Sequence, residues 1–324
     1  MVKKSTGINI KPNSLIYPYF VVTGENIRRK IKSFPGVYRL SIDKLLKDIG
    51  QIASLGLNKI LLFGIPDRKD PPGSGAYSKD NIVSSAVRKI KEIFPNLVVM
   101  TDVCLCAYTT HGHCGILKNR RSSFVVRRSS KNKNKIIDSK ATLKALSKMA
   151  LSHAEAGTDY IAPSAMAKKQ VSAIRKALDK NGFRKTKILG YSAKFASNFY
   201  GPFRNAAHSK PKFGDRSGYQ LPSGDRRLAL KEIENDIKEG ADIVMVKPAL
   251  SYLDIIREAK TKFRKPLAAY NTSGEYAFVK YGARSGLWDE RKMVFEIMTS
   301  IKRAGADFII TYHAKDIARW LREK

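Results

Sequence analysis

The sequence predicts a closed barrel of eight parallel β-strands surrounded by α-helices, formed as one domain over residues 1–324. Three observations support this fold class. Eight short apolar segments rich in β-branched residues recur along the chain, amphipathic segments with helical periodicity lie between them, and several of these helical segments end in glycine just before the next strand. Apolar strands of this kind are typical of a parallel sheet covered on both faces, and the repeated alternation with helices is typical of the (β/α)8, or TIM, barrel.

The elements follow in order after residues 1–14, which show neither a strand nor a helix pattern and are expected to form an N-terminal arm. Strands are predicted at 15–22, 59–64, 97–103, 159–163, 187–193, 242–246, 266–270 and 307–311, and helices at 41–53, 142–156, 170–181, 225–239, 252–262 and 289–304. The helix-ending glycines are Gly56, Gly157, Gly182, Gly240 and Gly305. An open doubly wound sheet is the alternative, but no Gly-x-Gly-x-x-Gly motif follows the first strand.

The composition is that of a globular protein with a large excess of basic residues. Lysine and arginine number 61 against 28 acidic residues, which gives a formal net charge of +33. The basic residues are spread along the whole chain, and the densest run, 118–135, has the pattern of a solvated loop. Because no helix-turn-helix, RNP or zinc-knuckle motif accompanies the charge, we expect no specific nucleic-acid partner. No segment has the roughly 18 apolar residues of a membrane span, and the N-terminus lacks the apolar part of a secretory signal, so we expect a cytoplasmic protein without a membrane partner.

All three cysteines of the chain lie in one window after the third predicted strand, DVCLCAYTTHGHCG at 102–115. Cys104 and Cys106 extend to one side of an extended backbone, and the turn at 111–115 can return Cys114 beside them. Three thiolates suit Zn²⁺ with an open fourth position, the arrangement of a catalytic zinc site. Three small buried cysteines at the end of a strand are the alternative interpretation.

In a parallel barrel, functional side chains gather where the strands end at the carboxyl face. The residues at the predicted strand ends are Asp102, Ser164, Lys194, Lys247, Tyr270 with Ser273, and Tyr312. Lys194 and Lys247 follow apolar strands directly, so burial and the neighbouring ammonium should both lower a lysine pKa there. A neutral lysine amine can attack a carbonyl carbon and form a Schiff base. Two such lysines would suit an enzyme that joins two carbonyl substrates.

Long motifs in this chain closely resemble the porphobilinogen synthase family, also called 5-aminolevulinate dehydratase. The matching segments are LIYP at 15–18, FPGVYRL at 34–40, the cysteine window at 102–115, GYSAKFAS at 190–197, FYGPFR at 199–204, MVKP at 245–248, SGEY at 273–276 and RAGAD at 303–307. The resemblance implies a TIM barrel, usually assembled as a homo-octamer through N-terminal arms. It also implies a lyase that condenses two 5-aminolevulinate molecules to porphobilinogen, early in tetrapyrrole and heme biosynthesis.

The resemblance assigns a role to each site residue. Lys247 corresponds to the Schiff-base lysine for the substrate that becomes the propionate side, and Lys194 to its partner for the acetate-side substrate. Arg204 and Arg216 correspond to a clamp for the acetate-side carboxylate. The remaining binding positions are the hydroxyl pair Ser273 and Tyr312 for the other carboxylate, the site-lining residues Phe203, Gln220 and Tyr270, and the strand-end residues Ser164 and Asp102. The segment 194–220 corresponds to a mobile lid.

The metals follow from the same resemblance. Cys104, Cys106 and Cys114 match the zinc-dependent branch of the family rather than the branch with aspartates at these places. Glu232 matches an allosteric Mg²⁺ ligand of some bacterial members, although the residue alone is an ordinary helix-surface carboxylate. Magnesium is therefore expected only through this resemblance.

The chain departs from the family after the fourth predicted strand. The family usually reads PSDMMDGR there, whereas this chain has PSAMAKKQ at 163–170, so Ala165, Lys168 and Lys169 replace two acids and a glycine. The missing acid at 165 is expected to alter proton transfer or the lysine pKa values and to reduce activity. Two alternative functions remain at this point: another class I Schiff-base enzyme of the aldolase type, or a non-catalytic basic binding protein built on a decayed barrel.

Overall fold

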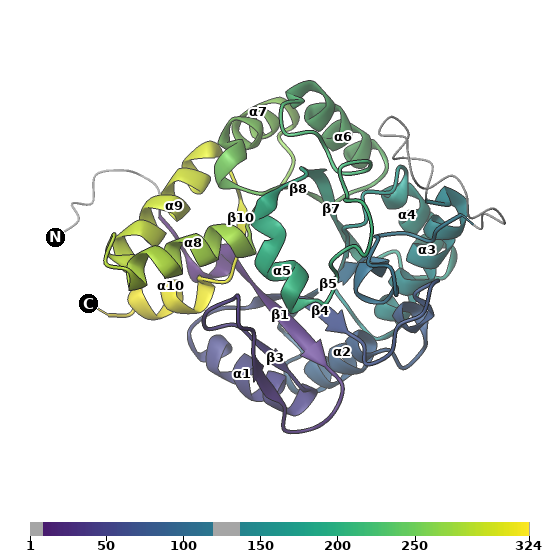
Figure 1. Ribbon diagram of the computed structural model, residues 1–324, viewed down its shortest axis with the longest axis horizontal. Coiled ribbons are helices and arrows are strands. Elements are labelled where there is room, and N and C mark those ends of the chain that lie inside the picture. Colours follow the sequence, from purple (N-terminus) through teal and green to yellow (C-terminus); the bar gives the residue numbers. More distant parts are fainter. Residues whose placement is uncertain (1–8, 119–136, 324) are drawn as a thin grey trace.

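The computed structural model describes residues 9–118 and 137–323, and its centre is the predicted barrel (Figure 1). Eight parallel strands are hydrogen-bonded in the order β10-β9-β8-β7-β6-β5-β4-β1, and a pairing of β10 with β1 closes the ring. In that closing pair Leu15 lies opposite Ile309 and Ile16 opposite Ile310. The (β/α)8 fold class is confirmed.

The predicted strands all form, with small differences at their ends. The barrel strands are β1 (Leu15–Val22), β4 (Lys59–Ile65), β5 (Val98–Val103), β6 (Tyr160–Pro163), β7 (Lys187–Lys194), β8 (Ile243–Lys247), β9 (Leu267–Asn271) and β10 (Phe308–Thr311). The predicted helices correspond to α1 (Ile42–Ser54), α3 (Ser139–Glu155), α4 (Gln170–Lys180), α6 (Arg226–Lys238), α7 (Leu253–Phe263) and α9 (Glu290–Ala304).

The structure adds elements that the hydrophobic pattern did not predict. They are the helices α2 (Ile82–Ile93), α5 (Gly201–Ala206), α8 (Ser273–Arg284) and α10 (Ala314–Trp320), and a hairpin of β2 (Arg28–Lys30) and β3 (Tyr38–Leu40). β3 runs parallel to the end of β1, with Phe20 opposite Arg39. The short helix α5 lies across the centre of the ring of strands, as Figure 1 shows.

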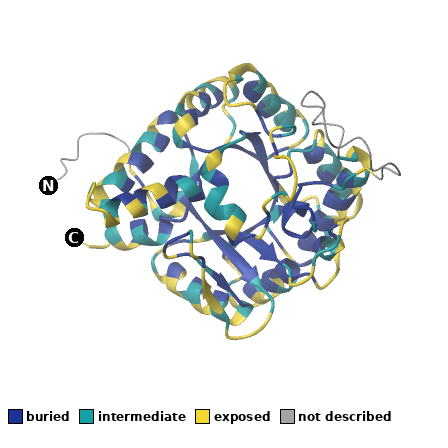
Figure 2. Ribbon diagram, in the orientation of Figure 1, coloured by how far each residue is buried: buried dark blue, intermediate teal, exposed yellow. Residues whose placement is uncertain are grey.

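The barrel strands are buried along most of their length (Figure 2). Alternate strand residues contribute to two different clusters of buried side chains. One cluster fills the barrel and includes Ile16, Phe20, Leu189, Met245 and Ile310, whereas the larger cluster packs the outer strand faces against the helices. Both faces of the strands are therefore buried, which explains their near-continuous apolar sequences.

Two predicted segments lie partly outside the described residues. Of the arm, residues 9–14 are described: Ile10 is buried and Pro12–Ser14 form a single 3-10 turn. Of the basic run at 118–135, only Lys118 belongs to the described part of the chain. Within residues 9–118 and 137–323, no helix has the length and apolar character needed to cross a membrane.

Candidate active site

Two lysines lie side by side at the mouth of the barrel. Lys194 is the last residue of β7 and Lys247 the last residue of β8, and the two are direct partners in the parallel pairing of these strands. Their exposed fractions are only 6% and 5%. The Lys194 ammonium donates a hydrogen bond of 2.5 Å to the carbonyl oxygen of Ser164, at the end of β6. Both lysines thus lie buried at the ends of apolar strands, where the sequence predicts them.

Aromatic rings surround Lys247. Its Nζ lies 3.9 Å from the centre of the Tyr270 ring and 5.3 Å from the centre of the Phe203 ring. Burial lowers the pKa of Lys247 well below its ordinary value, and the positive charge of Lys194 lowers it further. Both effects favour the neutral amine, which is the form that attacks a carbonyl carbon.

Asp102 supplies the carboxylate of this centre. It lies in β5, one strand from Ser164, and its Oδ1 atom is buried without a hydrogen-bond partner among the described residues. Burial raises the pKa of Asp102 to about 6, while a hydrogen bond with the Ser164 side chain and the charge of Lys194 act in the opposite direction. A carboxyl group with a pKa near 6 can both accept and donate a proton at physiological pH.

The three cysteines are buried, unoxidised and close together. The Sγ atoms of Cys104, Cys106 and Cys114 all lie within 4.8 Å of one another. Hydrogen bonds from the Cys104 and Cys106 thiols lower the pKa of Cys114 well below its ordinary value, and the nearby Arg216 charge adds to this effect. Three convergent sulfur atoms with one favoured thiolate fit a soft divalent metal such as Zn²⁺.

Several polar groups near the cysteines are buried without protein partners. The donors Nε of Arg204, Nε of Arg216 and Nε2 of Gln220, and the acceptor Oε1 of Gln220, have no hydrogen-bond partner within the described residues. Arg216 is only 4% exposed, and its Nη2 donates to the carbonyl oxygens of Gly112, at 3.1 Å, and of Ser209. Buried polar groups are costly when unpaired, so this set is suited to receive an anionic ligand such as a carboxylate.

The second predicted carboxylate site is formed by hydroxyl groups at the ends of β9 and β10. Ser273 begins α8, and its hydroxyl accepts a 3.1 Å hydrogen bond from the backbone N–H of Phe203. The Tyr312 hydroxyl, after β10, lies 3.1 Å from the Tyr270 hydroxyl. The hydroxyls of Ser273, Tyr270 and Tyr312 thus lie at the ends of neighbouring strands, as the sequence predicts.

Comparisons with known proteins agree on one family. The family model of delta-aminolevulinic acid dehydratase matches residues 2–320. The dehydratases of Synechocystis sp. and Bacillus subtilis are 49% and 46% identical to this chain, and each alignment covers 100% of this chain and 94% of the relative. The chain belongs to the delta-aminolevulinic acid dehydratase family. The sequence-based prediction of the family is confirmed.

A solved structure of the dehydratase family supports the same placement. The delta-aminolevulinic acid dehydratase of Toxoplasma gondii ME49, in complex with its reaction product porphobilinogen, superimposes with a TM-score of 0.91 at 39% identity. The match covers 98% of this chain and 88% of that one. The roles of individual residues in this chain are not tested by the comparison and stay predictions.

The departure from the family pattern lies on the wall of a cavity beside the cysteines. This cavity, of about 520 Å³, is lined by Cys114, Ala165, Lys168, Gln220 and Glu232, among others. Ala165 is only 3% exposed, so the methyl group occupies the place of the family's acid. Glu232, in α6, is half-buried and belongs to no cluster of three metal-ligating groups within the described residues. The predicted magnesium site therefore stays a prediction.

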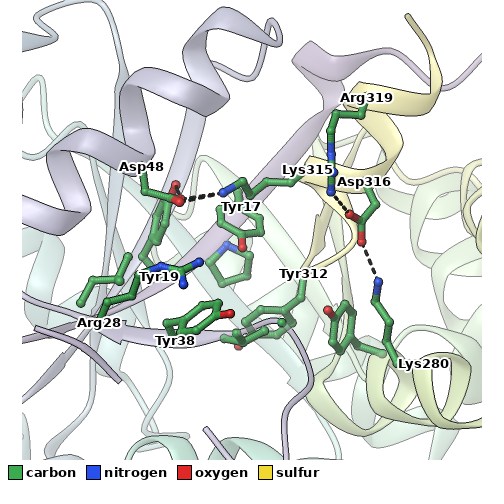
Figure 3. Close-up of a pocket in the computed structure, with 15 residues that line it drawn as sticks. Tyr17, Tyr19, Arg28, Tyr38, Asp48, Lys280, Tyr312, Lys315, Asp316 and Arg319 are labelled. Atoms are coloured by element: carbon green, nitrogen blue, oxygen red, sulfur yellow. Dashed lines mark hydrogen bonds and ion pairs between the residues drawn. The ribbon is translucent and has the colours of Figure 1, made fainter. Parts of the chain in front are cut away.

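A second cavity, of about 250 Å³, is lined by Tyr312 but not by Lys194 or Lys247 (Figure 3). Most of its charged groups pair with one another, whereas Arg28 lies over the Tyr38 ring, 3.6 Å from the ring centre. Lys315 bonds both oxygens of Asp48, and Asp316 lies between Lys280 and Arg319. This cavity therefore carries more basic than acidic side chains and is separate from the pair Lys194 and Lys247.

Sequence reasoning missed several residues of the site. The Tyr191 ring lies 5.2 Å from Nζ of Lys247 and 5.5 Å from Nζ of Lys194. An irregular register between Gly190 and Ala193 places Tyr191 inside the barrel together with Lys194, although simple alternation would put them on opposite faces. Tyr219, whose hydroxyl accepts from the backbone N–H of Cys114 at 3.4 Å, was also missed. Its place within the predicted lid was the available signal.

Proposed function

We propose that this protein condenses two molecules of 5-aminolevulinate to porphobilinogen, with the release of two waters, through Schiff bases on Lys194 and Lys247. The observation that carries the proposal is the pairing of these two buried lysines on adjacent strands. A reaction that joins two amino-ketones needs two carbonyl-activating amines at one place. Family membership supports the same activity.

Lys247 serves as the nucleophile for the substrate that becomes the propionate side. Its neutral amine adds to the ketone carbon, and loss of one water gives an imine. Lys194 forms the second imine with the loss of the second water. Formation of the carbon–carbon and carbon–nitrogen bonds releases both lysines, so the atoms balance. Asp102, with its pKa of about 6, exchanges protons with these groups.

The two substrate carboxylates bind at two different sets of hydrogen-bonding groups. The unpartnered guanidinium donors of Arg204 and Arg216, with the Gln220 amide, receive the acetate-side carboxylate. The hydroxyls of Ser273 and Tyr312 receive the other one. Phe203 and Tyr270 exclude water from the reacting amine, since both rings pack close to Nζ of Lys247.

Cys104, Cys106 and Cys114 would hold a zinc ion. When bound, zinc acts as a Lewis acid and lowers the pKa of a ligand in its open position. The mutual approach of the three sulfur atoms supports this assignment. The proposal includes three further points. A magnesium ion at Glu232 and assembly as a homo-octamer are supported by the family resemblance. A cytoplasmic location is supported by the sequence features given above.

A direct assay tests the proposal. The purified protein is incubated with 5-aminolevulinate and zinc, and the pyrrole product is measured by its colour reaction with an aromatic aldehyde. We expect product with the wild type and none with Lys247→Met. A class I aldolase-type enzyme would retain a substrate adduct but give no pyrrole, whereas a non-catalytic binding protein would give neither, and either result would overturn the proposal.

A further inference from the structure

The short helix α5 is held from outside the barrel at its C-terminal end. A helix leaves its last carbonyl groups without partners inside the helix. Here the Arg39 side chain supplies two donors: its Nε lies 2.8 Å from the carbonyl oxygen of Ala206, and its Nη2 lies 2.8 Å from that of Asn205. A positive charge at this end also complements the helix dipole, although α5 is short.

Arg39 is well placed to act as a fixed anchor. It lies in β3, paired with Phe20 of β1, and only 9% of it is exposed. A buried guanidinium with two hydrogen bonds is a directional contact that a single ammonium cannot reproduce. Two nearby contacts are weaker: Asn205 donates to the Ser33 hydroxyl at 3.1 Å, and Lys69 donates to the carbonyl oxygen of His208 at 2.6 Å from a partly exposed position.

The helix that Arg39 holds carries two residues of the proposed site. Phe203 packs against Lys247 and donates its backbone N–H to Ser273, whereas Arg204 offers its unpartnered Nε. Arg216 donates to the carbonyl oxygen of Gly112 and to that of Ser209, whose N–H is in turn bonded to the Arg204 carbonyl oxygen. A shift of α5 would therefore displace Arg204 and Phe203 most directly, whereas Lys194 and Lys247 stay fixed by their strands.

We propose that Arg39 is a positioning residue that latches α5 over the barrel mouth and thereby sets the affinity for the acetate-side substrate. The inference rests on the proposed function, because it concerns the binding of the second 5-aminolevulinate. Arg39 itself does not contact the lysines. Its effect passes through the backbone of α5 to Arg204.

The test compares Arg39→Gln, Arg39→Lys and the control Ser33→Ala. We expect Arg39→Gln to raise KM by about ten- to a hundred-fold, the range for loss of charge-assisted hydrogen bonds, with kcat changed only a few-fold. Arg39→Lys should raise KM less than Arg39→Gln does, because lysine keeps the positive charge but lacks the two parallel donors of the guanidinium group. Ser33→Ala should stay within about two-fold of wild type. A KM unchanged in Arg39→Gln, or a loss of kcat with no change in KM, would overturn the inference.

A second measurement does not depend on turnover. Trypsin can cleave after Lys212, which is exposed and follows α5, whereas Pro211 blocks cleavage after Lys210. Release of the helix should accelerate this cleavage in Arg39→Gln and, to a smaller degree, in Arg39→Lys, while the melting temperature of Arg39→Lys stays near that of wild type. Equal cleavage rates in all variants would contradict the latch. Absence of pyrrole from the wild type would instead overturn the proposed function and leave the cleavage result to decide the latch.

Discussion

Lys247 lies where three features of its surroundings act on one amine. Burial and the neighbouring Lys194 lower its pKa, and the rings of Tyr270 and Phe203 keep water away. Asp102 and Glu275 oppose the shift, but burial has the largest effect. Desolvation therefore lowers the pKa of Lys247 most, and the charge of Lys194 has the second largest effect.

At the residue scale, we predict that Ala165→Asp raises kcat by about ten-fold or less. An acid here would follow Ser164, whose carbonyl oxygen binds Lys194, and could exchange protons during bond formation. The measurement is kcat as a function of pH, with Ala167→Asp as a control in the same cavity. A shift of the acid limb to higher pH without a gain in kcat would show that the added charge only raises the lysine pKa. No change in rate or profile would contradict the expectation that the missing acid limits activity.

A second residue-scale prediction concerns His313, which is buried and whose two ring nitrogens have no hydrogen-bond partner among residues 9–118 and 137–323. Burial lowers the pKa of His313 from 6.5 to about 3, with the Lys280 charge adding to the shift. As the pH falls below 6.5, the unfolded chain binds a proton that the folded chain does not, so folding loses stability. Between pH 6.5 and 4.5, the free energy of unfolding of the wild type should fall by about 2 kcal/mol more than that of His313→Phe. Urea unfolding at each pH measures this difference. Identical pH dependence of the two proteins would contradict the burial-driven pKa.

At the scale of elements, the strands were predictable and several helices were not. Each barrel strand is apolar on both faces, so its sequence is unambiguous. The hairpin of β2 and β3 was missed because Arg28–Lys30 has no apolar residue and gains its order from pairing with β3. The helix α5 was missed because six residues are too few to show a helical period, and the Arg39 contact that holds it is remote in sequence. The strand-end residues and the cysteines could be predicted because every parallel strand ends at the same face, whereas Tyr191 depends on a local irregularity of β7.

An element-scale prediction follows from the start of α4. Lys169 precedes this helix with φ at +64°, a left-handed conformation that favours glycine, and its side chain makes no capping hydrogen bond. Lys169→Gly should raise the free energy of unfolding by about 1 kcal/mol, because glycine adopts the left-handed conformation without the steric cost of a Cβ atom. Lys168→Gly is the matched control, since it removes the same charge at a residue without a positive φ, and should destabilise the protein. Chemical denaturation measures both, and a Lys169→Gly protein no more stable than wild type would contradict the explanation.

At the scale of the whole molecule, the barrel brings residues from distant parts of the chain together at one face. The barrel core is formed by strand residues from one end of the chain to the other, and the site is assembled at the face where those strands end. Residues as far apart as Asp102 and Tyr312 therefore contribute to one centre. The cysteine window follows β5, and its three cysteines are buried in the larger hydrophobic cluster, which strand and helix residues from the rest of the chain mainly form.

At this scale, we predict that loss of the metal site affects activity far more than stability. Cys104→Ala combined with Cys106→Ala, or treatment with a chelator, should remove nearly all pyrrole formation while the melting temperature changes by only a few degrees. Activity assays before and after adding back zinc, with thermal unfolding of the same samples, measure both effects. Full activity in the metal-free protein would contradict the proposed role of the cysteines.

The central claim is that the two strand-end lysines form covalent imines with substrate, and borohydride trapping tests it most directly. The protein is incubated with 5-aminolevulinate, reduced with sodium borohydride, digested, and examined by mass spectrometry. The account predicts a reduced substrate adduct on Lys247, a second on Lys194 when both substrates are bound, and no adduct at residue 247 in Lys247→Met. A wild-type protein that forms porphobilinogen yet shows no adduct on either lysine would contradict it.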